Sequence, residues 1–267
     1  MTSTRRPEQP ETDLAGMRAQ VYKDPRPAEH FTRFHERART RRPDWVYGVV
    51  RVITTLYGMV AFRARGVGAE KVPATGPVIL APNHFSFMDH FFVGMFLRRQ
   101  VQFMAKSQLF KRPMQFVYTH GGVFPVRRGQ NDQEAFITAQ AILERGGCVV
   151  MYCEGGRSRT GDLAERAKPG IGRLALQSGA PVVPVAIHGS QRVRNWKRLS
   201  FPQVTVHYGD PMVFTDGPEA GRERQQEVAD QIFGEVKRLY APLDDPSARL
   251  RKEAGRGAAA SLLRPQP

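Results

Sequence analysis

Cysteine is scarce in this 267-residue sequence: only Cys148 and Cys153 are present, both within one apolar segment. Positions five apart in a strand face opposite sides of a sheet, so the two thiols are not placed to bond to each other. Two cysteines also make no zinc site, and no set of histidine, cysteine and carboxylate residues has ligand spacing. The sequence therefore predicts reduced thiols, no bound metal and no cofactor.

Long hydrophobic runs are also missing. The longest uncharged apolar stretch near the amino terminus covers residues 52–62, well short of the roughly 20 residues that a membrane-spanning helix needs. Residues 1–13 are polar and contain prolines, unlike a secretory signal. These features predict a peripheral protein that lies on a membrane at its cytoplasmic face and does not cross it.

Acidic residues are few: 25 Asp and Glu stand against 40 Lys and Arg, giving a formal net charge of +15. No acidic residue lies between Asp89 and Asp132, where basic residues alternate with many Phe, Leu and Met residues. A basic and strongly apolar surface is typical of contact with anionic headgroups above acyl chains. Nucleic-acid-binding surfaces favour exposed aromatic platforms, and a solvated basic face is the structural alternative. We expect an anionic membrane surface as a partner and no nucleic acid.

Three regions differ in composition. Residues 1–43 are rich in proline and arginine and are predicted to form a basic, largely disordered segment. A helical pattern from residue 45 to about residue 62 follows, so we expect a basic N-terminal helical element that rests in headgroups or packs on the domain. Residues 44–242 are predicted to form the main domain, and residues 243–267 a flexible tail rich in Ala, Arg and Gly.

Apolar segments from Pro77 onward alternate between the strand and the helix period. Strands are expected at residues 77–81, 101–105, 122–126, 148–153, 181–187 and 203–208, and helices near residues 87–98, 107–118, 132–145, 169–178 and 219–240. This alternation predicts an α/β fold with a mixed, largely parallel central sheet flanked by helices.

A histidine and an aspartate, His84 and Asp89, follow the first of these strands. The loop between a strand end and a helix start is where α/β proteins place their chemistry. Histidine exchanges a proton near neutral pH, and a carboxylate on its other ring nitrogen fixes its tautomer. Taken alone, the spacing also fits a helix start, with Ser86 as the cap and Asp89 near the positive end of the helix dipole.

Two later strands lead into arginines. The strand at residues 122–126 ends at Arg127 and Arg128, and the strand at residues 148–153 opens into Glu154-Gly155-Gly156-Arg157-Ser158. Glycines let backbone N–H groups approach an anion closely, and arginine binds phosphate through two parallel hydrogen bonds. These segments predict a phosphate-binding region that the sheet brings close to the histidine.

In this order, the segments resemble the motifs of the glycerolipid acyltransferase family, of the 1-acylglycerol-3-phosphate O-acyltransferase (lysophosphatidic acid acyltransferase) type. His84 and Asp89 stand in its Asn-His-x4-Asp motif. Gly122 and Arg128 match its Gly-x5-Arg strand, with Arg127 as the alternative if the register shifts by one residue.

The third and fourth motifs of that family are matched further along. Glu154, Gly155, Arg157 and Ser158 match its Pro-Glu-Gly-Thr-Arg-Ser motif, in which Cys153 and Gly156 replace the proline and the threonine. The apolar segment around Pro184 matches the fourth motif, and the resemblance covers roughly residues 45–240. The two replacements bear on the acyl acceptor more than on the reaction.

The resemblance implies an O-acyltransferase that makes phosphatidic acid in phospholipid biosynthesis. His84 would act as the general base on the hydroxyl of a lysophospholipid acceptor, 1-acylglycerol 3-phosphate, which attacks the thioester of acyl-CoA or of an acyl carrier protein. Asp89 would orient His84 and stabilise its cation. Substrate binding is assigned, by the same resemblance, to Arg128, Glu154, Gly155, Arg157 and Ser158.

Two alternatives remain open at this level. The first keeps the chemistry and changes the acceptor to another lysophospholipid or to a lipid or sugar hydroxyl, as the altered third motif allows. The second is a non-catalytic basic module that binds membranes. The second differs from the enzyme in one measurable respect: replacing His84 would leave all of its activity untouched.

Overall fold

The computed structural model describes residues 24–127, 132–158, 160–193, 201–217 and 219–244. Its centre is a seven-stranded sheet in the order β1-β7-β6-β2-β5-β3-β4. Neighbouring strands run parallel except β6 and β7, which are antiparallel. The strands are β1 (Arg65–Val67), β2 (Val78–Pro82), β3 (Gln102–Lys106), β4 (Val123–Val126), β5 (Cys148–Val150), β6 (Val182–His188) and β7 (Thr205–Tyr208).

The three middle strands, β6, β2 and β5, consist of residues that are all buried. Continuous apolar runs of this kind are typical of parallel strands that are covered on both faces. In β2 the side chains alternate: Val78 and Leu80 pack into one core, and Ile79 and Ala81 into the other. The sheet therefore separates two hydrophobic layers, and β2 anchors both.

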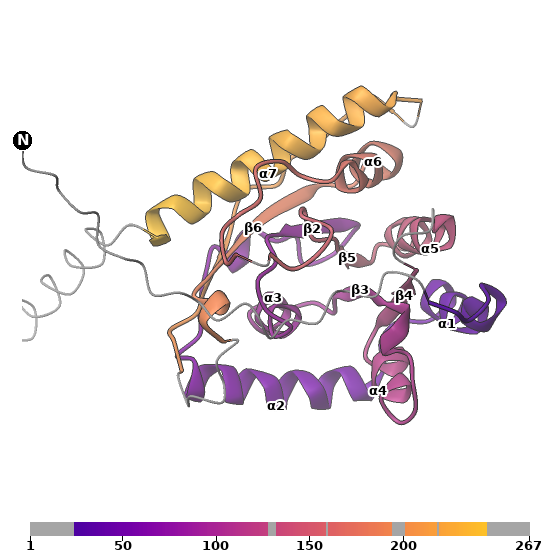
Figure 1. Ribbon diagram of the computed structural model, residues 1–267, viewed down its shortest axis with the longest axis horizontal. Helices are drawn as coiled ribbons and strands as arrows, with labels where there is room; N and C mark the ends of the chain where they lie inside the picture. The colour runs from indigo at the N-terminus through magenta and orange to yellow at the C-terminus, as the bar shows by residue number, and fades with distance from the viewer. Residues whose placement is uncertain (1–23, 128–131, 159, 194–200, 218, 245–267) are drawn as a thin grey trace, which may run out of the picture.

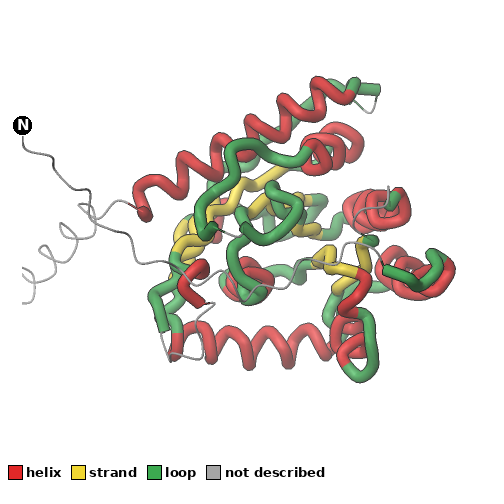
Figure 2. Tube along the Cα trace, in the orientation of Figure 1, coloured by secondary structure: helices red, strands yellow, loops and turns green. Residues whose placement is uncertain are grey.

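Helices cover both faces of the sheet (Figures 1 and 2). One layer contains α3 (Asp89–Met95), with α2 (Trp45–Ala61) packed outside it. The other contains α5 (Gln133–Glu144), α6 (Pro169–Ser178) and α7 (Arg222–Asp244). Figure 1 shows α6 and α7 above the strands and α2 along the lower edge.

The amino-terminal segment differs from its prediction where it is described. Residues 29–40 were expected to be largely disordered, yet they form the helix α1 (Glu29–Thr40), which packs against α5 and β4. Phe31 and Phe34 are buried and cluster with Phe110, and these aromatic contacts outweigh the arginine-rich composition. Residues 1–23 and 245–267, to which the remaining predictions of disorder apply, lie outside the described residues.

The structure also differs from the sequence-based expectation at three local points. The expected helix at residues 107–118 is split into the short η2 (Ser107–Leu109) and α4 (Met114–His120), with Pro113 between them, because proline lacks the N–H that a continuous helix requires. Cys153 lies past the end of β5, although Cys148 and Cys153 do pack on opposite faces of the sheet, as expected. The three exposed residues of β1 have no strand signature and were missed.

The helix α2 exposes much of its apolar surface. It begins at the cap Asp44, whose carboxylate accepts from the Val46 N–H. It packs on α3 through Gly58, where a Cβ would lie 2.6 Å from the Met95 Cε. Its outward residues are nevertheless exposed: Trp45, Val49, Val52, Ile53, Leu56, Tyr57, Met59 and Val60. None of the helices in the described ranges is both long enough and apolar enough to span a bilayer.

Candidate active site

The candidate residues lie at the carboxyl ends of parallel strands. β2 ends at Pro82 and is followed by His84, and β5 ends at Val150 and is followed by Glu154. Because β2 and β5 are adjacent and parallel, the segments that follow them leave the sheet at the same edge. The sheet thus brings together two segments that are about 70 residues apart in the sequence.

His84 and Asp89 form a buried pair. The His84 Nδ1 lies 2.8 Å from the Asp89 Oδ2, and the two residues are 4% and 0% exposed. The same carboxylate oxygen accepts from the backbone N–H groups of Phe85 (2.7 Å) and Ser86 (2.8 Å). Since a carboxylate oxygen only accepts, Nδ1 carries the proton and Nε2 is the basic nitrogen of the neutral ring. This is the tautomer that a general base requires.

The predicted helix cap takes a different form. Asp89 is the first residue of α3, and the preceding Met88 has no side-chain cap. Ser86 lies two residues before Met88, and its Oγ accepts from the Met88 N–H at 3.2 Å. The Asp89 carboxylate turns back onto the loop and the histidine, so its principal contacts are with that loop and not with the helix end.

Tyr152 supports the His84 ring from one face. The two rings are stacked with centroids 3.9 Å apart and an interplanar angle of 21°. Burial, and secondarily Asp89, raises the pKa of Tyr152, so the hydroxyl keeps its proton, and its oxygen lies in hydrogen-bond contact with the His90 Nδ1 at 2.7 Å. Sequence reasoning missed this residue. An aromatic side chain just beyond a buried strand, two positions before Glu154, was the available signal.

Asn83 fixes where the loop leaves the sheet. Its side-chain Oδ1 accepts from the Ile187 N–H at 2.7 Å, and its Nδ2 donates to the Ile187 carbonyl at 3.0 Å. This side chain imitates a backbone partner and extends the β2–β6 pairing past its last register pair, Pro82 with Val185. The histidine therefore starts from a fixed position beside β6.

Glu154 links the two loops. Its carboxylate accepts from the His84 N–H at 2.7 Å and from the Ala164 N–H at 2.9 Å, while the Ser158 N–H donates to the His84 carbonyl at 2.8 Å. Burial raises the pKa of Glu154, although both N–H donors oppose that shift. The family resemblance assigns this glutamate to substrate binding. In the structure it holds backbone groups, which leave no signature in a sequence.

Removing the Glu154 carboxylate is expected to destabilise the folded chain. We expect Glu154→Ala to lower the free energy of unfolding by about 2–4 kcal/mol, because two N–H groups lose their acceptor in a partly buried position. The exposed Glu165, in the same loop, is the matched control, and Glu165→Ala is expected to change stability by less than about 0.5 kcal/mol. Urea unfolding measures both. Equal stabilities of the two variants would contradict the structural role of Glu154.

The stability of the folded chain is expected to depend on pH through the Glu154 carboxyl. Burial raises the pKa of Glu154 in the folded chain above its unfolded value, so the unfolded chain ionises first as the pH rises. The contribution of this carboxyl is therefore complete below its unfolded pKa of about 4.3 and is lost as the pH rises through the higher folded pKa. Glu154→Gln is expected to remove this part of the pH dependence.

The arginines predicted to bind phosphate differ in their surroundings. Arg128 lies outside the described residues. Arg127, the alternative, donates its backbone N–H to Asp132 at 2.6 Å, and its Nη2 lies 3.4 Å from the Arg26 carbonyl oxygen. Arg157 is partly buried, and no carboxylate within the described ranges forms an ion pair with it. Its charge is thus available to an anion.

Gly155 and Ser158 shape the loop that carries Arg157. Gly155 has φ +64, and a Cβ there would lie 3.0 Å from the Lys168 Cγ, so both the backbone conformation and the close packing favour glycine. Its N–H donates to the Tyr152 carbonyl at 3.1 Å and is used by the turn, not left to cradle a phosphate. The Ser158 Oγ accepts from the Gly161 N–H at 3.1 Å. Both residues therefore order the loop.

Acid–base chemistry is what this arrangement supports. A histidine with a fixed tautomer, a buried carboxylate behind it and an arginine in an adjoining loop suit proton removal from a hydroxyl of an anionic substrate. Within the described ranges, no three His, Cys, Asp or Glu side chains are grouped so as to hold a metal ion. Both cysteines are buried, and burial raises the pKa of the Cys148 thiol to about 12, which makes a reactive thiolate unfavourable.

The central part of the chain is similar to known proteins. Residues 63–188 match the family model described as Acyltransferase. A chloroplastic 1-acyl-sn-glycerol-3-phosphate acyltransferase of Brassica napus is 27% identical over 130 residues, 47% of this chain and 37% of the relative. The human 1-acyl-sn-glycerol-3-phosphate acyltransferase beta is 28% identical over 161 residues, 59% of this chain and 56% of the relative. The chain spans about half the length of the curated relatives it matches.

A solved structure shares the fold. The crystal structure of PlsC, a 1-acyl-sn-glycerophosphate acyltransferase from Thermotoga maritima, matches with a TM-score of 0.54 and 23% sequence identity. The match covers 78% of this chain and 89% of that one. The prediction of an α/β fold with a mixed, largely parallel sheet flanked by helices is thereby confirmed.

Proposed function

Residues 63–188 belong to the Acyltransferase family, and from this premise we propose that the protein moves a fatty acyl group from a thioester to the free hydroxyl of a lysophospholipid. The proposed acceptor is 1-acylglycerol 3-phosphate, and the product is phosphatidic acid. The relatives named above carry this acceptor in their names, which supports the proposal together with the phosphate-binding chemistry of Arg157.

The observation that carries the proposal is the direct link between the two halves of the site. His84 is paired with Asp89 on one side and, through its backbone, bonded to Glu154 and Ser158 on the other. A phosphate held in the loop of Arg157 therefore lies in a segment that is fixed to the base. Positioning of this kind favours attack by a hydroxyl of the same acceptor molecule.

The reaction uses only proton transfer and acyl exchange. The His84 Nε2 removes the acceptor's hydroxyl proton as the oxygen attacks the thioester carbonyl. The C–S bond then breaks, the new C–O ester bond remains, and the thiolate takes the proton back from the imidazolium. Asp89 stabilises that imidazolium. We propose acyl-CoA or an acyl carrier protein as the donor and no cofactor, since each step is served by these residues.

We also propose that the protein acts at the cytoplasmic face of a membrane as a peripheral enzyme. Eight exposed apolar residues of α2 lie between arginine pairs: Arg41 and Arg42 precede the helix, and Arg63 and Arg65 follow it, all exposed. An apolar face flanked by cationic side chains suits acyl chains below anionic headgroups. The acceptor, which resides in the membrane, would then be supplied directly to the site.

The acceptor is tested with a panel of lysolipids. The purified full chain is supplied with radiolabelled acyl-CoA or acyl carrier protein and with 1-acylglycerol 3-phosphate, other lysophospholipids, or monoacylglycerol, which lacks phosphate. We expect fastest transfer to 1-acylglycerol 3-phosphate, and we expect Arg157→Gln to reduce this preference over monoacylglycerol. Failure with every phosphate-bearing acceptor would reject the phosphate hypothesis.

Two replacements in the third family motif favour a second class of acceptor. Gly156 and Cys153 stand where the motif has threonine and proline, and both positions adjoin Glu154 and Arg157. Loss of the threonine hydroxyl removes a hydrogen-bonding group beside the phosphate-binding loop. Preferential transfer to another lysophospholipid in the same panel would therefore assign the protein to that acceptor while leaving the roles of His84 and Asp89 unchanged.

A further inference from the structure

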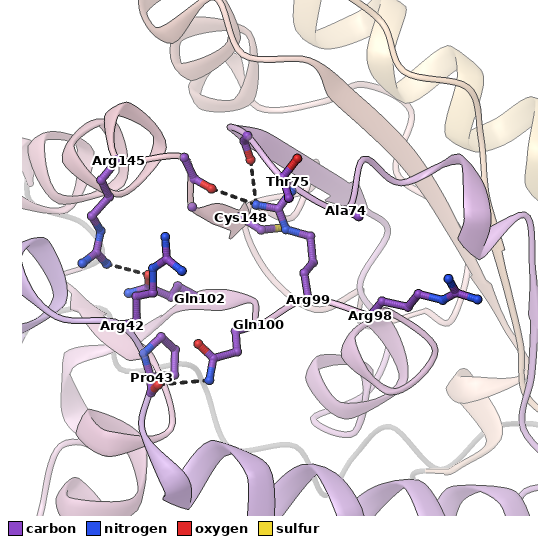
Figure 3. Close-up of a pocket in the computed structure, with 13 residues that line it drawn as sticks. Arg42, Pro43, Ala74, Thr75, Arg98, Arg99, Gln100, Gln102, Arg145 and Cys148 are labelled. Carbon is purple, nitrogen blue, oxygen red and sulfur yellow. Dashed lines mark hydrogen bonds between the residues drawn. The ribbon is translucent and has the colours of Figure 1, made fainter.

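A second site is indicated at the amino ends of the parallel strands, away from His84. A cavity of about 380 Å³ lies at the amino ends of β2, β3 and β5 (Figure 3). Gly76 precedes β2, Gln102 begins β3 and Cys148 begins β5. Since these strands are parallel, the cavity is at the other end of the strands from His84. Its volume is within the range of small-molecule sites.

The lining of the cavity is strongly basic. Among the described residues that line it are four arginines, Arg42, Arg98, Arg99 and Arg145, and no aspartate or glutamate. Within the described residues none of the four forms an ion pair. Figure 3 shows the Arg42 and Arg145 guanidinium groups near each other, while the Arg98 side chain extends away from them. Positive charge is gathered here without a counterion from the protein.

Two of the arginines are held in place by neutral groups. Arg99 donates to the carbonyls of Pro73 (2.7 Å), Gly76 (2.7 Å) and Gly146 (3.0 Å). Arg145 donates to the Ala38 carbonyl (2.7 Å) and to the Gln102 Oε1 (2.8 Å). These contacts fix the guanidinium planes without neutralising them. A rigid, uncompensated pair of this kind is preorganised for an anion.

Arg145 in particular lacks a full set of partners. Its Nε is buried and has no hydrogen-bond partner among the residues that the structure describes. Burial, followed by the charge of Arg42, lowers the pKa of Arg145, which reflects the cost of a cation that is desolvated and close to a like charge. An anion in the cavity would relieve both costs. A chloride-sized ion would leave most of the cavity empty, whereas a phosphate offers several acceptor oxygens to the planar guanidinium groups.

We propose that this cavity binds a phosphate-bearing anion, a phosphomonoester or diphosphate group, through Arg42, Arg99 and Arg145. The site is separate from the proposed acyl-transfer site and does not depend on that function. Arg42 lies between α1 and α2 and is the exposed member of the three. It is therefore the residue whose replacement tests binding without disturbing carbonyl contacts that hold the fold.

Pyrophosphate titration into the full chain at constant ionic strength tests the proposal. We expect saturable binding by calorimetry and a rise of Tm with ligand concentration. Arg42→Gln should raise the Kd about tenfold, as expected for one lost charge-assisted contact. Arg41→Gln removes the same charge one position away, from an exposed side chain outside the cavity, and should leave the Kd within about twofold. Absence of saturable binding, or equal losses in both variants, would overturn the proposal.

A second variant supplies the missing counterion. Figure 3 shows Thr75 beside the Arg99 guanidinium, and Thr75 is exposed in the turn before β2. Thr75→Glu should abolish pyrophosphate binding and raise the Tm of the ligand-free chain, because its carboxylate occupies the place of the anion. A variant that binds pyrophosphate as tightly as the wild type would count against the site.

Vesicles distinguish the two sources of such a phosphate. Binding is compared on phosphatidylcholine vesicles containing either phosphatidic acid, a phosphomonoester, or phosphatidylglycerol, a phosphodiester. If Arg42→Gln, relative to Arg41→Gln, weakens binding to phosphatidic acid vesicles selectively, the ligand is a lipid headgroup. If it weakens only pyrophosphate binding, the ligand is a soluble phosphate compound. Either result supports an anion site, and an effect in neither assay rejects it.

Discussion

We expect the substitution His84→Ala to lower the rate of the proposed acyl transfer by about 10²–10⁴-fold, the contribution of a positioned general base. The expectation rests on the 2.8 Å contact between the His84 Nδ1 and the Asp89 Oδ2, which assigns Nε2 to proton removal. Steady-state assays with radiolabelled acyl-CoA and 1-acylglycerol 3-phosphate measure the change. The loss should appear in kcat, since the base acts in the transition state and not in acceptor binding.

The fold should survive this substitution. Asp89 keeps the N–H groups of Phe85 and Ser86 as donors, and the backbone of residue 84 keeps its bonds to Glu154 and Ser158. Cooperative unfolding and binding to vesicles should therefore be retained. His30→Ala, at an exposed position of α1, is the matched control and should retain turnover. Equal turnover by His84→Ala and wild type would favour the non-catalytic membrane-binding module.

Asp89→Asn separates orientation from proton transfer. The Asp89 Oδ2 accepts three hydrogen bonds, from the His84 ring and from two backbone N–H groups. An amide oxygen still accepts but carries no charge with which to stabilise the imidazolium. Its NH₂ group, turned toward the ring, would select the other tautomer. We therefore expect a large loss of kcat here as well.

Much of the site could be predicted because its residues follow apolar strands. The apolar run before His84 and the run before Glu154 each predict a buried strand, and parallel neighbours end at one edge. The structure brings these two segments together through the hydrogen bonds between His84, Glu154 and Ser158. The phosphate-binding roles of Arg128 and Arg157 stay predictions.

Other features depend on contacts that a sequence does not encode locally. The backbone-binding role of Glu154 and the amide bridge from Asn83 to Ile187 involve main-chain partners, which exist at every position. The cavity at the opposite edge combines side chains from several separate segments, so no spacing reveals it. Helix α1 was missed because its arginines dominate the composition, whereas its order comes from the buried rings of Phe31 and Phe34.

The second large effect is expected on membrane binding. Ile53 and Leu56 are 61% and 60% exposed on the outer face of α2, and burial of each in a bilayer contributes roughly 1.5–3 kcal/mol. Replacing both by aspartate should therefore weaken binding to phosphatidylcholine–phosphatidylglycerol vesicles by about 10²–10⁴-fold. Added repulsion from the anionic headgroups acts in the same direction. Co-sedimentation over a range of lipid concentrations measures the change.

The matched control replaces two exposed aliphatic residues outside α2 by aspartate. Ile137 on α5 and Val213 after β7 are also exposed aliphatic residues, at 45% and 60%, but α5 covers the face of the sheet opposite to α2. Ile137→Asp with Val213→Asp changes the net charge equally and should leave vesicle binding nearly unchanged. Comparable losses in both double variants would show that net charge, and not the face of α2, governs attachment. The α2 variant should retain acyl transfer to a short-chain acceptor in solution, because Ile53 and Leu56 are mostly exposed. A loss of this activity would mean that α2 supports the site itself.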